Sequence, residues 1–163
     1  MDLAQNWPRI LETLAAGKRS CKHFAIATVD PSGGPHVTPI GHAFFRDDMT
    51  GYYFDAYSKA MPLHFQSNRR ICLMAVNSSS GFWLRSLLKG QFGTPPAVRL
   101  FGEVSDTRDA TQTELARLRD TIRMTRSLKG HQLLWGGLNR VRDMKFSSFA
   151  PVVYPAMSEG LWR

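Results

Sequence analysis

The feature that most constrains the fold is a series of short apolar segments, separated by turn residues, in the first third of the chain. Phe24 to Val29 is an apolar segment rich in residues that favour β-strands. Residues 30–34 (Asp-Pro-Ser-Gly-Gly) follow it, and proline and glycine supply the backbone angles that a reversing turn requires. A return strand over Pro35 to Arg46, a second turn at 47–51 and a third strand from Tyr52 continue the pattern. This order predicts an antiparallel meander.

Three later apolar segments extend the predicted sheet: Ile71 to Val76, Val98 to Val104 and Met144 to Tyr154. Before the meander, apolar residues recur every three or four positions over residues 2–16, which predicts an amphipathic helix that ends near Gly17. No linker, repeat or low-complexity tract interrupts the chain of 163 residues, and this length suits one domain. The sequence therefore predicts a mainly β protein with flanking helices, with six antiparallel strands in a single domain over residues 1–163.

The chain carries an excess of positive charge, with 21 lysines and arginines against 13 aspartates and glutamates, a formal net charge of +8. Such an excess is found on nucleic-acid-binding surfaces, around sites for phosphorylated ligands and on soluble surfaces that are merely basic. A helix predicted to open at residues 109–112 places four arginines on its polar face: Arg117, Arg119, Arg123 and Arg126. A solvated face is the ordinary interpretation of such a row, so a basic nucleic-acid-binding protein remains only a remote alternative.

The sequence shows no sign of a membrane span, of secretion or of a metal site. No apolar run approaches the roughly 20 residues that a spanning helix needs, and the amino terminus lacks the basic and apolar pattern of a secretory signal. We therefore expect a cytoplasmic protein in which Cys21 and Cys72 stay reduced. The five histidines do not have the spacing of a metal-ligand set, although His36 and His42 would share a face in an unbroken strand.

Two short motifs suggest a ligand site. Pro39 interrupts a segment that otherwise predicts a strand, and proline has no N–H for the ladder, so nearby backbone groups would be left for a heteroaromatic ring to satisfy. Ser58 and Lys59 stand at the predicted start of a helix, where a hydroxyl, free N–H groups and an ammonium together suit a phosphate dianion. Each motif alone is better explained by an edge strand or an ordinary helix cap. Together they favour a phosphorylated ring system.

Five motifs follow one another in a distinctive order: Ala27-Thr28-Val29-Asp30, Gly34-Pro35-His36-Val37-Thr38-Pro39-Ile40, Tyr53-Phe54-Asp55, Ser58-Lys59-Ala60 and Asn68-Arg69-Arg70-Ile71-Cys72-Leu73. In this order and spacing the chain resembles the pyridoxamine 5'-phosphate oxidase-related, FMN-binding split-barrel family. Each motif is loose alone, whereas the combination is fairly specific. The resemblance implies a six-stranded antiparallel split β-barrel of the FMN-binding type over residues 22–154, preceded by the helix at 2–16.

The resemblance also implies which residues would contact the ring of a bound flavin. Thr38, Pro39 and Ile40 would line the isoalloxazine ring, largely through main-chain atoms. Phe54 and Asp55 would lie on the adjoining strand, near the ring or the ribityl chain.

The resemblance also implies which residues would bind the phosphate and which would come from a second subunit. Ser58 and Lys59 would hold the phosphate of FMN. In this family the flavin usually lies at a homodimer interface, so the second subunit would complete the site. Arg99 or Trp135 could make that contribution, although no motif selects either one.

The function implied by the resemblance is an FMN-dependent oxidoreductase of unknown substrate, with NAD(P)H or another small redox molecule as its reaction partner. No catalytic residue is assigned. Members that oxidise pyridoxamine phosphate tend to have arginine in place of Thr38 and an Arg-Lys pair in place of Ser58-Lys59, and their carboxy-terminal arginine-and-histidine motif has no counterpart in residues 158–163. The chain is therefore not predicted to be a pyridoxamine-phosphate oxidase. A non-catalytic protein of the same fold that binds flavin, the deazaflavin F420 or haem is the alternative.

Overall fold

Seven strands form one antiparallel sheet in the computed structural model of this chain, which describes residues 1–55 and 58–162. The strands are β1 (Phe24–Val29), β2 (Pro35–Ile40), β3 (Ala43–Phe45), β4 (Thr50–Phe54), β5 (Arg70–Val76), β6 (Ala97–Asp109) and β7 (Arg140–Pro151). Residues 56–57 and 163, which fall within the predicted domain, lie outside the described residues. The strand pattern predicted from the sequence is confirmed for the first hairpin, and β6 is longer than expected.

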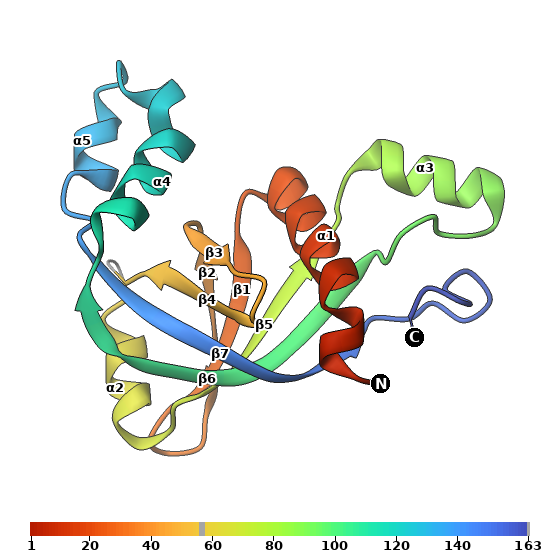
Figure 1. Cartoon of the computed structure of the whole chain (residues 1–163), viewed down its shortest axis with the longest axis horizontal. Helices are drawn as coiled ribbons and strands as arrows, with labels where there is room; N and C mark the ends of the chain where they lie inside the picture. The colour runs from red at the N-terminus through yellow and green to blue at the C-terminus, as the bar shows by residue number, and fades with distance from the viewer. Residues whose placement is uncertain (56–57, 163) are drawn as a thin grey trace.

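The sheet is curled into a half-open barrel (Figure 1). Its strand order is β2-β1-β5-β6-β7-β4-β3, so β2 and β3 follow each other in the chain and yet lie at opposite edges. Only Gly41 and His42 join them, and the Phe54 N–H donates to the His42 carbonyl at 3.1 Å across this junction. The edges must therefore approach each other. The expected six strands become seven because the return strand leaves β1 at Gly41 and pairs with β4 instead.

Two prolines sit in the edge strand β2 without breaking it. Pro35 lies opposite Val29 and Pro39 lies opposite Ala25 in the register with β1. The Asp30 N–H donates to the Gly34 carbonyl at 2.9 Å, and hydrogen-bonded pairs alternate along an antiparallel ladder. Both prolines therefore occupy positions whose missing N–H would face away from β1. The predicted break at Pro39 was wrong, since the strand continues to Ile40 and the break comes at Gly41.

Over residues 1–55 and 58–162, five α-helices and one short 3-10 helix accompany the sheet, so the fold is mixed α and β and not mainly β. They are α1 (Leu3–Cys21), α2 (Ala60–Ser67), α3 (Ser80–Lys89), α4 (Gln112–Ile122), η1 (Arg123–Thr125) and α5 (Gly130–Trp135). In Figure 1, α3 and the pair α4–α5 project at opposite ends of the molecule. Among the residues that the structure describes, no helix has both the length and the apolar content needed to cross a membrane.

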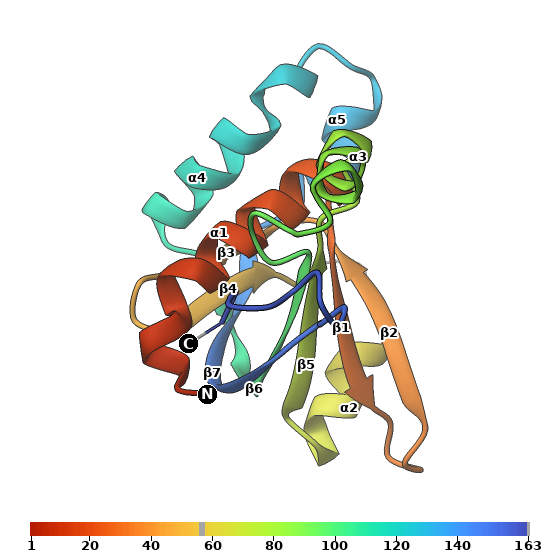
Figure 2. The same cartoon turned by 90° about the vertical axis from the view of Figure 1, so that its right-hand side faces the viewer.

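Helix α1 lies across one side of the sheet and supplies much of the core (Figure 2). Its buried residues Trp7, Ile10 and Leu14 belong to one cluster with Leu73 of β5 and Leu100 of β6. This cluster fixes the side of the sheet that faces the core. The opposite side of β5 and β6 therefore faces outward.

Helix α1 runs past the predicted stop at Gly17 because that residue serves close packing. A Cβ at Gly17 would lie 3.1 Å from the Ala75 Cβ and 3.2 Å from backbone atoms of Val76, so the glycine lets the helix approach β5. The helix ends instead at Cys21, and Lys22 caps it with a φ of 67° and an N–H that donates to the Lys18 carbonyl. The predicted helix at 2–16 was therefore too short.

Helices α4 and α5 pack on β4 and β7 through a second apolar cluster that includes Tyr52, Phe54, Leu118 and Val141. The capping box that opens α4 is made by Thr111 and Glu114, two residues after the position inferred from the sequence. This cluster brings the segment after α5 beside the junction of β2 and β3.

Candidate functional site

A cavity of about 190 Å³ lies where the two edges of the sheet meet. Three segments of the chain surround it: the end of β2 with its link to β3, the end of β4 with the residue that precedes α2, and a residue that follows α5. The lining residues are Thr38, Pro39, Ile40, Gly41, His42, Tyr53, Phe54, Asp55, Ser58 and Leu138. We refer to this space as the junction cavity.

The junction cavity brings together six of the nine residues predicted to bind a cofactor. They are Thr38, Pro39, Ile40, Phe54, Asp55 and Ser58. The closure of the sheet explains this convergence, because it places the end of β2 beside the end of β4 although the two strands do not pair with each other. The role of these residues in binding a cofactor stays a prediction.

The start of α2 carries the predicted phosphate-binding pair. The Ser58 hydroxyl oxygen accepts the Met61 N–H at 3.0 Å, which confirms the expected capping of the helix. Its O–H remains a donor, while Pro62 has no N–H to offer. Lys59 is exposed at the N-cap position, beside the wall of the cavity. The Ser58 hydroxyl, the Lys59 ammonium and the N–H of Ala60 are thus the donors at this end.

Asp55 lies in a buried ion pair. Its Oδ2 accepts from Nη2 and Nε of Arg142 at 2.9 and 3.0 Å, and both side chains are only 7% exposed. Thr107 donates to the same oxygen at 3.4 Å, and Arg142 also donates to the Ser105 carbonyl at 2.8 Å. Breaking such a pair leaves an uncompensated buried charge, which costs several kcal/mol. Asp55 therefore fixes the end of β4 against β7, and it presents a carboxylate to the cavity.

His42 lines the cavity, although it was not among the residues predicted to bind a cofactor. Burial, followed by the charge of Lys18, lowers the pKa of His42 to about 4, so its ring is neutral near pH 7. The Lys18 ammonium donates to the carbonyls of Gly41 and Lys22, and thereby ties the end of α1 to the β2–β3 junction. A neutral imidazole can donate one hydrogen bond and accept another.

His36 and His42 do not share a face of the sheet, as they would have done in an unbroken strand. His36 faces the carboxylate of Asp30, with Nε2 to Oδ2 at 3.1 Å, and its ring lies 4.7 Å from that of the buried His64. His42 instead faces Trp135. The break at Gly41 separates their environments. Within the described part of the chain, no group of three or more His, Cys, Asp or Glu side chains is arranged to hold a metal ion.

The two residues suggested for the partner's contribution lie in different places. Trp135, at the end of α5, has its ring centroid 6.1 Å from that of His42 in the same chain, so it adjoins the junction cavity. Arg99 lies on β6, opposite Met74 and Ala150, on the outward side of the sheet. It does not line the junction cavity.

Four lining residues were missed from the sequence: Gly41, His42, Tyr53 and Leu138. Gly41, directly after the motif Thr38-Pro39-Ile40, carried a signal, because a glycine inside a strand pattern suggests a bend or bulge. Leu138 carried none, since only the packing of α4 and α5 brings it to the cavity.

The donors and acceptors around the junction cavity suit two parts of a flavin mononucleotide, its phosphate and the polar edge of its ring. The start of α2 suits a phosphate, and the outward carbonyls of β2 with the Thr38 hydroxyl suit the polar edge of an isoalloxazine ring. A volume of about 190 Å³ is below the 300 Å³ or so typical of small-molecule pockets. One chain would therefore enclose only part of the molecule.

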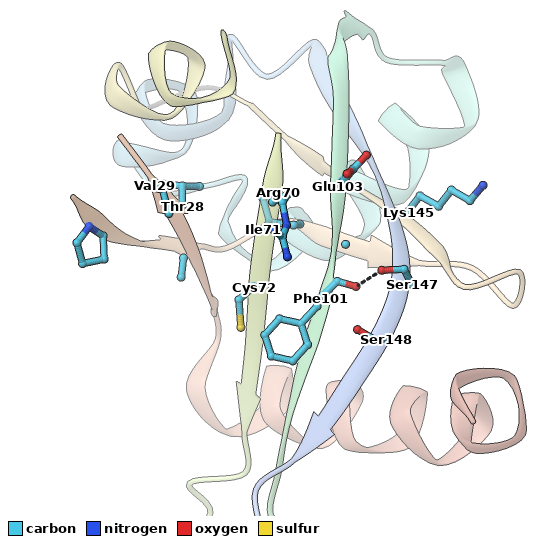
Figure 3. Close-up of a pocket in the computed structure, with 13 residues that line it drawn as sticks. Thr28, Val29, Arg70, Ile71, Cys72, Phe101, Glu103, Lys145, Ser147 and Ser148 are labelled. Atoms are coloured by element: carbon cyan, nitrogen blue, oxygen red, sulfur yellow. Dashed lines mark hydrogen bonds between the residues drawn. The ribbon is translucent and has the colours of Figure 1, made fainter. Parts of the chain in front are cut away.

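A second and larger cavity, of about 650 Å³, lies on the outward side of the sheet (Figure 3). It spans β1, β5, β6 and β7, with Pro35 of β2 at its edge. None of the nine predicted residues lines it. We refer to this space as the outer cavity.

Comparisons with known proteins agree with this architecture. The family model described as pyridoxamine 5'-phosphate oxidase matches residues 10–144. No curated protein matches the chain in sequence. Among solved structures, HupZ of Group A Streptococcus is 15% identical with a TM-score of 0.55, and the similarity covers 87% of this chain and 92% of HupZ.

Two further solved structures have the same fold. An FMN-binding protein of Syntrophomonas wolfei subsp. wolfei is 10% identical with a TM-score of 0.63, over 92% of this chain and 90% of that one. An F420 reductase is 15% identical with a TM-score of 0.51, over 78% of this chain and 88% of the reductase. At such identities the similarity concerns the fold alone.

The family model begins within α1 and ends within β7, so it includes β1 to β6, the start of β7 and every residue that lines the junction cavity. Sequence and architecture thus agree over most of the chain. The chain belongs to the pyridoxamine 5'-phosphate oxidase family.

Proposed function

We propose that this protein binds flavin mononucleotide at the junction cavity and acts as an FMN-dependent oxidoreductase. The observation that carries the proposal is the convergence of Thr38, Pro39 and Ile40 with Asp55 and Ser58 around one cavity. The similarity in fold to an FMN-binding protein supports it.

The chain's own residues would bind and orient the cofactor. Ser58 and Lys59 would hold the phosphate through charge-assisted hydrogen bonds, while β2 would face the ring with carbonyls and the Thr38 hydroxyl. His42 would stay neutral beside it and add no positive charge. When bound, FMN supplies the hydride-transfer chemistry, with NAD(P)H or another small molecule as the donor.

A homodimer would complete the site. The junction cavity of one chain is too small for the whole cofactor, and Pro39 and Lys59 are exposed at its rim. A second subunit placed over this rim would enclose the remaining surface of the ring and exclude water. Light scattering at micromolar concentration would give a molecular mass of two chains.

The test is titration of the purified protein with FMN, followed by the quenching of flavin fluorescence. We expect Lys59→Gln to weaken FMN binding about tenfold or more, because a hydrogen bond to a charged group contributes about 1.5–3 kcal/mol. Lys89→Gln on α3 removes a lysine at the far end of the molecule and should leave the affinity unchanged.

The outcomes separate the proposal from its alternatives. Protein that stays colourless and does not quench FMN at any concentration would contradict the proposal. Binding of F420 or haem in preference to FMN would assign the cavity to a different cofactor. Bound FMN that NADH and NADPH reduce no faster than free FMN would indicate a binding protein without turnover.

A further inference from the structure

We propose that α3 binds the surface of an anionic phospholipid membrane, with a row of leucines against the lipid and two neighbouring cations on the phosphates. The helix projects from one end of the molecule, opposite α4 and α5 (Figure 1). Among the residues that the structure describes, none from α3 lines the junction cavity. The proposal therefore goes beyond flavin binding and does not depend on it.

The outward side of α3 is apolar, whereas a surface helix ordinarily turns polar residues toward the solvent. Leu84, Leu87 and Leu88 are separated by three and four positions, so they share one side of the helix. They are 61%, 64% and 81% exposed, respectively. An exposed apolar patch of this kind marks a surface that contacts a protein or a membrane.

Contacts on the inner side of α3 keep the leucines outward. The Phe82 ring stacks on the Phe92 ring with centroids 5.5 Å apart, and the Trp83 Nε1–H donates to the Asn77 carbonyl at 2.8 Å. The buried Ser86 hydroxyl donates to the Phe82 carbonyl at 2.9 Å. Together these contacts fix the rotation of the helix about its axis.

Aromatic side chains border the leucines. Trp83 is half-buried and lies four positions before Leu87, so the two are neighbours on the helix surface. Its ring meets that of Tyr154 edge-on, with centroids 5.5 Å apart, and Tyr154 is partly exposed. Tryptophan and tyrosine are enriched where a membrane meets water, because each joins an apolar ring to one polar group.

The charge around α3 is positive. Arg85 and Lys89 are exposed and four positions apart, next to the leucines. Over the described part of the chain, neither side chain forms a hydrogen bond or an ion pair. No aspartate or glutamate occurs between Asp55 and Glu103 in the sequence, and the neighbouring carboxy-terminal turn contributes Glu159. Free cations beside an apolar face match an anionic membrane.

A cavity of about 430 Å³ lies at the cationic side of the helix. Arg85 and Lys89 line it, as do Gln91 and Thr94 of the loop that follows α3. Its described lining residues include no carboxylate. A guanidinium, an ammonium, an amide and a hydroxyl are donors that suit the phosphate of a lipid headgroup. One lipid would thus meet the cations with its phosphate and the leucines with its acyl chains.

The test is flotation of the purified protein with lipid vesicles. Vesicles of equimolar phosphatidylcholine and phosphatidylglycerol, here called mixed vesicles, should carry the protein. Vesicles of phosphatidylcholine alone should bind it about tenfold more weakly or less, because the cations add to the apolar contact only at an anionic surface. Absence of binding to mixed vesicles, or equal binding to both kinds, would overturn the proposal.

Double variants on α3 separate this helix from the general positive charge of the chain. Leu84→Gln with Leu88→Gln should weaken binding to mixed vesicles about tenfold or more, because the apolar contact is lost. Arg85→Gln with Lys89→Gln should weaken it by about as much on mixed vesicles and leave binding to neutral ones unchanged. All four residues are exposed, so the fold should persist, which a thermal melt checks.

The matched control variants lie at the opposite end of the molecule. Leu133→Gln on α5 removes a leucine that is 85% exposed, and Lys129→Gln removes an exposed lysine that precedes α5. Both should bind mixed vesicles as the parent protein does. If they weaken binding as much as the changes on α3, the membrane does not bind at α3.

Hydrogen exchange tests the rival occupant of the leucines, a second copy of this chain. Mixed vesicles should protect the amides of α3 and leave those of α5 unchanged. Protection of α3 that rises with protein concentration in the absence of vesicles, with a smaller mass for Leu84→Gln and Leu88→Gln in light scattering, would assign the leucines to a contact between copies. That result would overturn the proposal.

A cross-over keeps this proposal apart from the proposed function. Lys59→Gln should weaken FMN binding and leave vesicle binding as in the parent protein, while Arg85→Gln with Lys89→Gln should do the reverse. Failure to bind mixed vesicles in a protein that still quenches FMN fluorescence would overturn the membrane proposal alone. Vesicle binding without FMN binding would overturn only the proposed function.

Discussion

Individual residues decide where the backbone can come close to itself. Gly102 is the clearest case, because a side chain there would overlap the Lys145 carbonyl of the neighbouring strand. Gly17 has the same role between α1 and β5. Neither residue has a positive φ, so packing and not backbone conformation requires the glycine.

We expect Gly102→Ala to lower the free energy of unfolding by about 1–3 kcal/mol, the usual cost of forcing extra atoms into a packed site. Urea denaturation measures this loss. Gly81→Ala is the matched control, because nothing lies within 4 Å of a Cβ there and alanine suits its position in α3. Equal stability of the two variants would show that β6 and β7 can separate at Gly102.

His42 gives a second prediction at the residue scale. Its pKa is lowered to about 4 in the folded protein, against about 6.5 in an unfolded chain. Between these values the unfolded state binds a proton that the folded state does not, so stability rises with pH by at most about 1.4 kcal/mol per pH unit.

His42→Asn should flatten this slope between pH 4 and 6.5, as measured by urea denaturation at several pH values. Above pH 7, the pH dependence of the free energy of unfolding should be nearly the same in the variant and the parent protein. A slope identical to that of the parent protein would show that His42 is protonated in the folded state.

At the scale of elements, a network of four charged side chains holds α4 to the barrel. Arg108 of β6 donates to Glu114 at 2.8 and 2.9 Å and to Asp143 at 2.6 and 2.9 Å, and Arg46 reaches both carboxylates at 3.2 Å. Hydrogen bonds from Arg108 lower the pKa of both acids. Glu114 also forms the capping box, so helix capping and docking use one residue.

We expect Arg108→Gln to cost about 1–2 kcal/mol near neutral pH, a discounted value because a third of the Arg108 side chain is exposed. The pKa of each acid is lowered in the folded protein. The stabilisation by the network is therefore fully present at pH values above the ordinary carboxyl pKa of about 4, and it disappears as the pH falls through the lowered pKa values.

The difference between parent and Arg108→Gln should therefore shrink at pH 3, which urea denaturation at pH 6 and pH 3 would show. Arg119→Gln on the exposed side of α4 is the control and should change stability little at either pH. A constant difference at both values would mean that the network does not depend on ionised carboxylates.

At the scale of the whole molecule, stability is unevenly distributed. The long strands β6 and β7 lie in the middle of the sheet and contribute Val98, Leu100 and Met144 to the core. By contrast, α5 has no buried residue and α3 buries only Ser86. We therefore expect α3 and α5 to open locally at a lower free energy than the barrel strands.

Native-state hydrogen exchange should show this order. We expect the slowest amides in β5, β6 and α1, and exchange faster by orders of magnitude in α5, where local opening exposes little apolar surface. Equal protection of α5 and β6 would contradict this and indicate that a partner subunit covers the helix.

The sequence by itself determined the local features. Turn residues and β-forming segments set the first hairpin and the start of α2, since φ preferences and capping act over a few residues. The motifs around Thr38 and Ser58 also identified six residues of the junction cavity.

Only the tertiary structure decided how distant segments meet. Closure of the sheet by Gly41 and His42, the packing of Gly17 on β5, and the approach of Leu138 to the cavity depend on contacts between residues far apart in the chain. The outer cavity depends on a register shift between β6 and β7. Local propensity does not encode such contacts, because the same backbone preferences are compatible with several registers and packings.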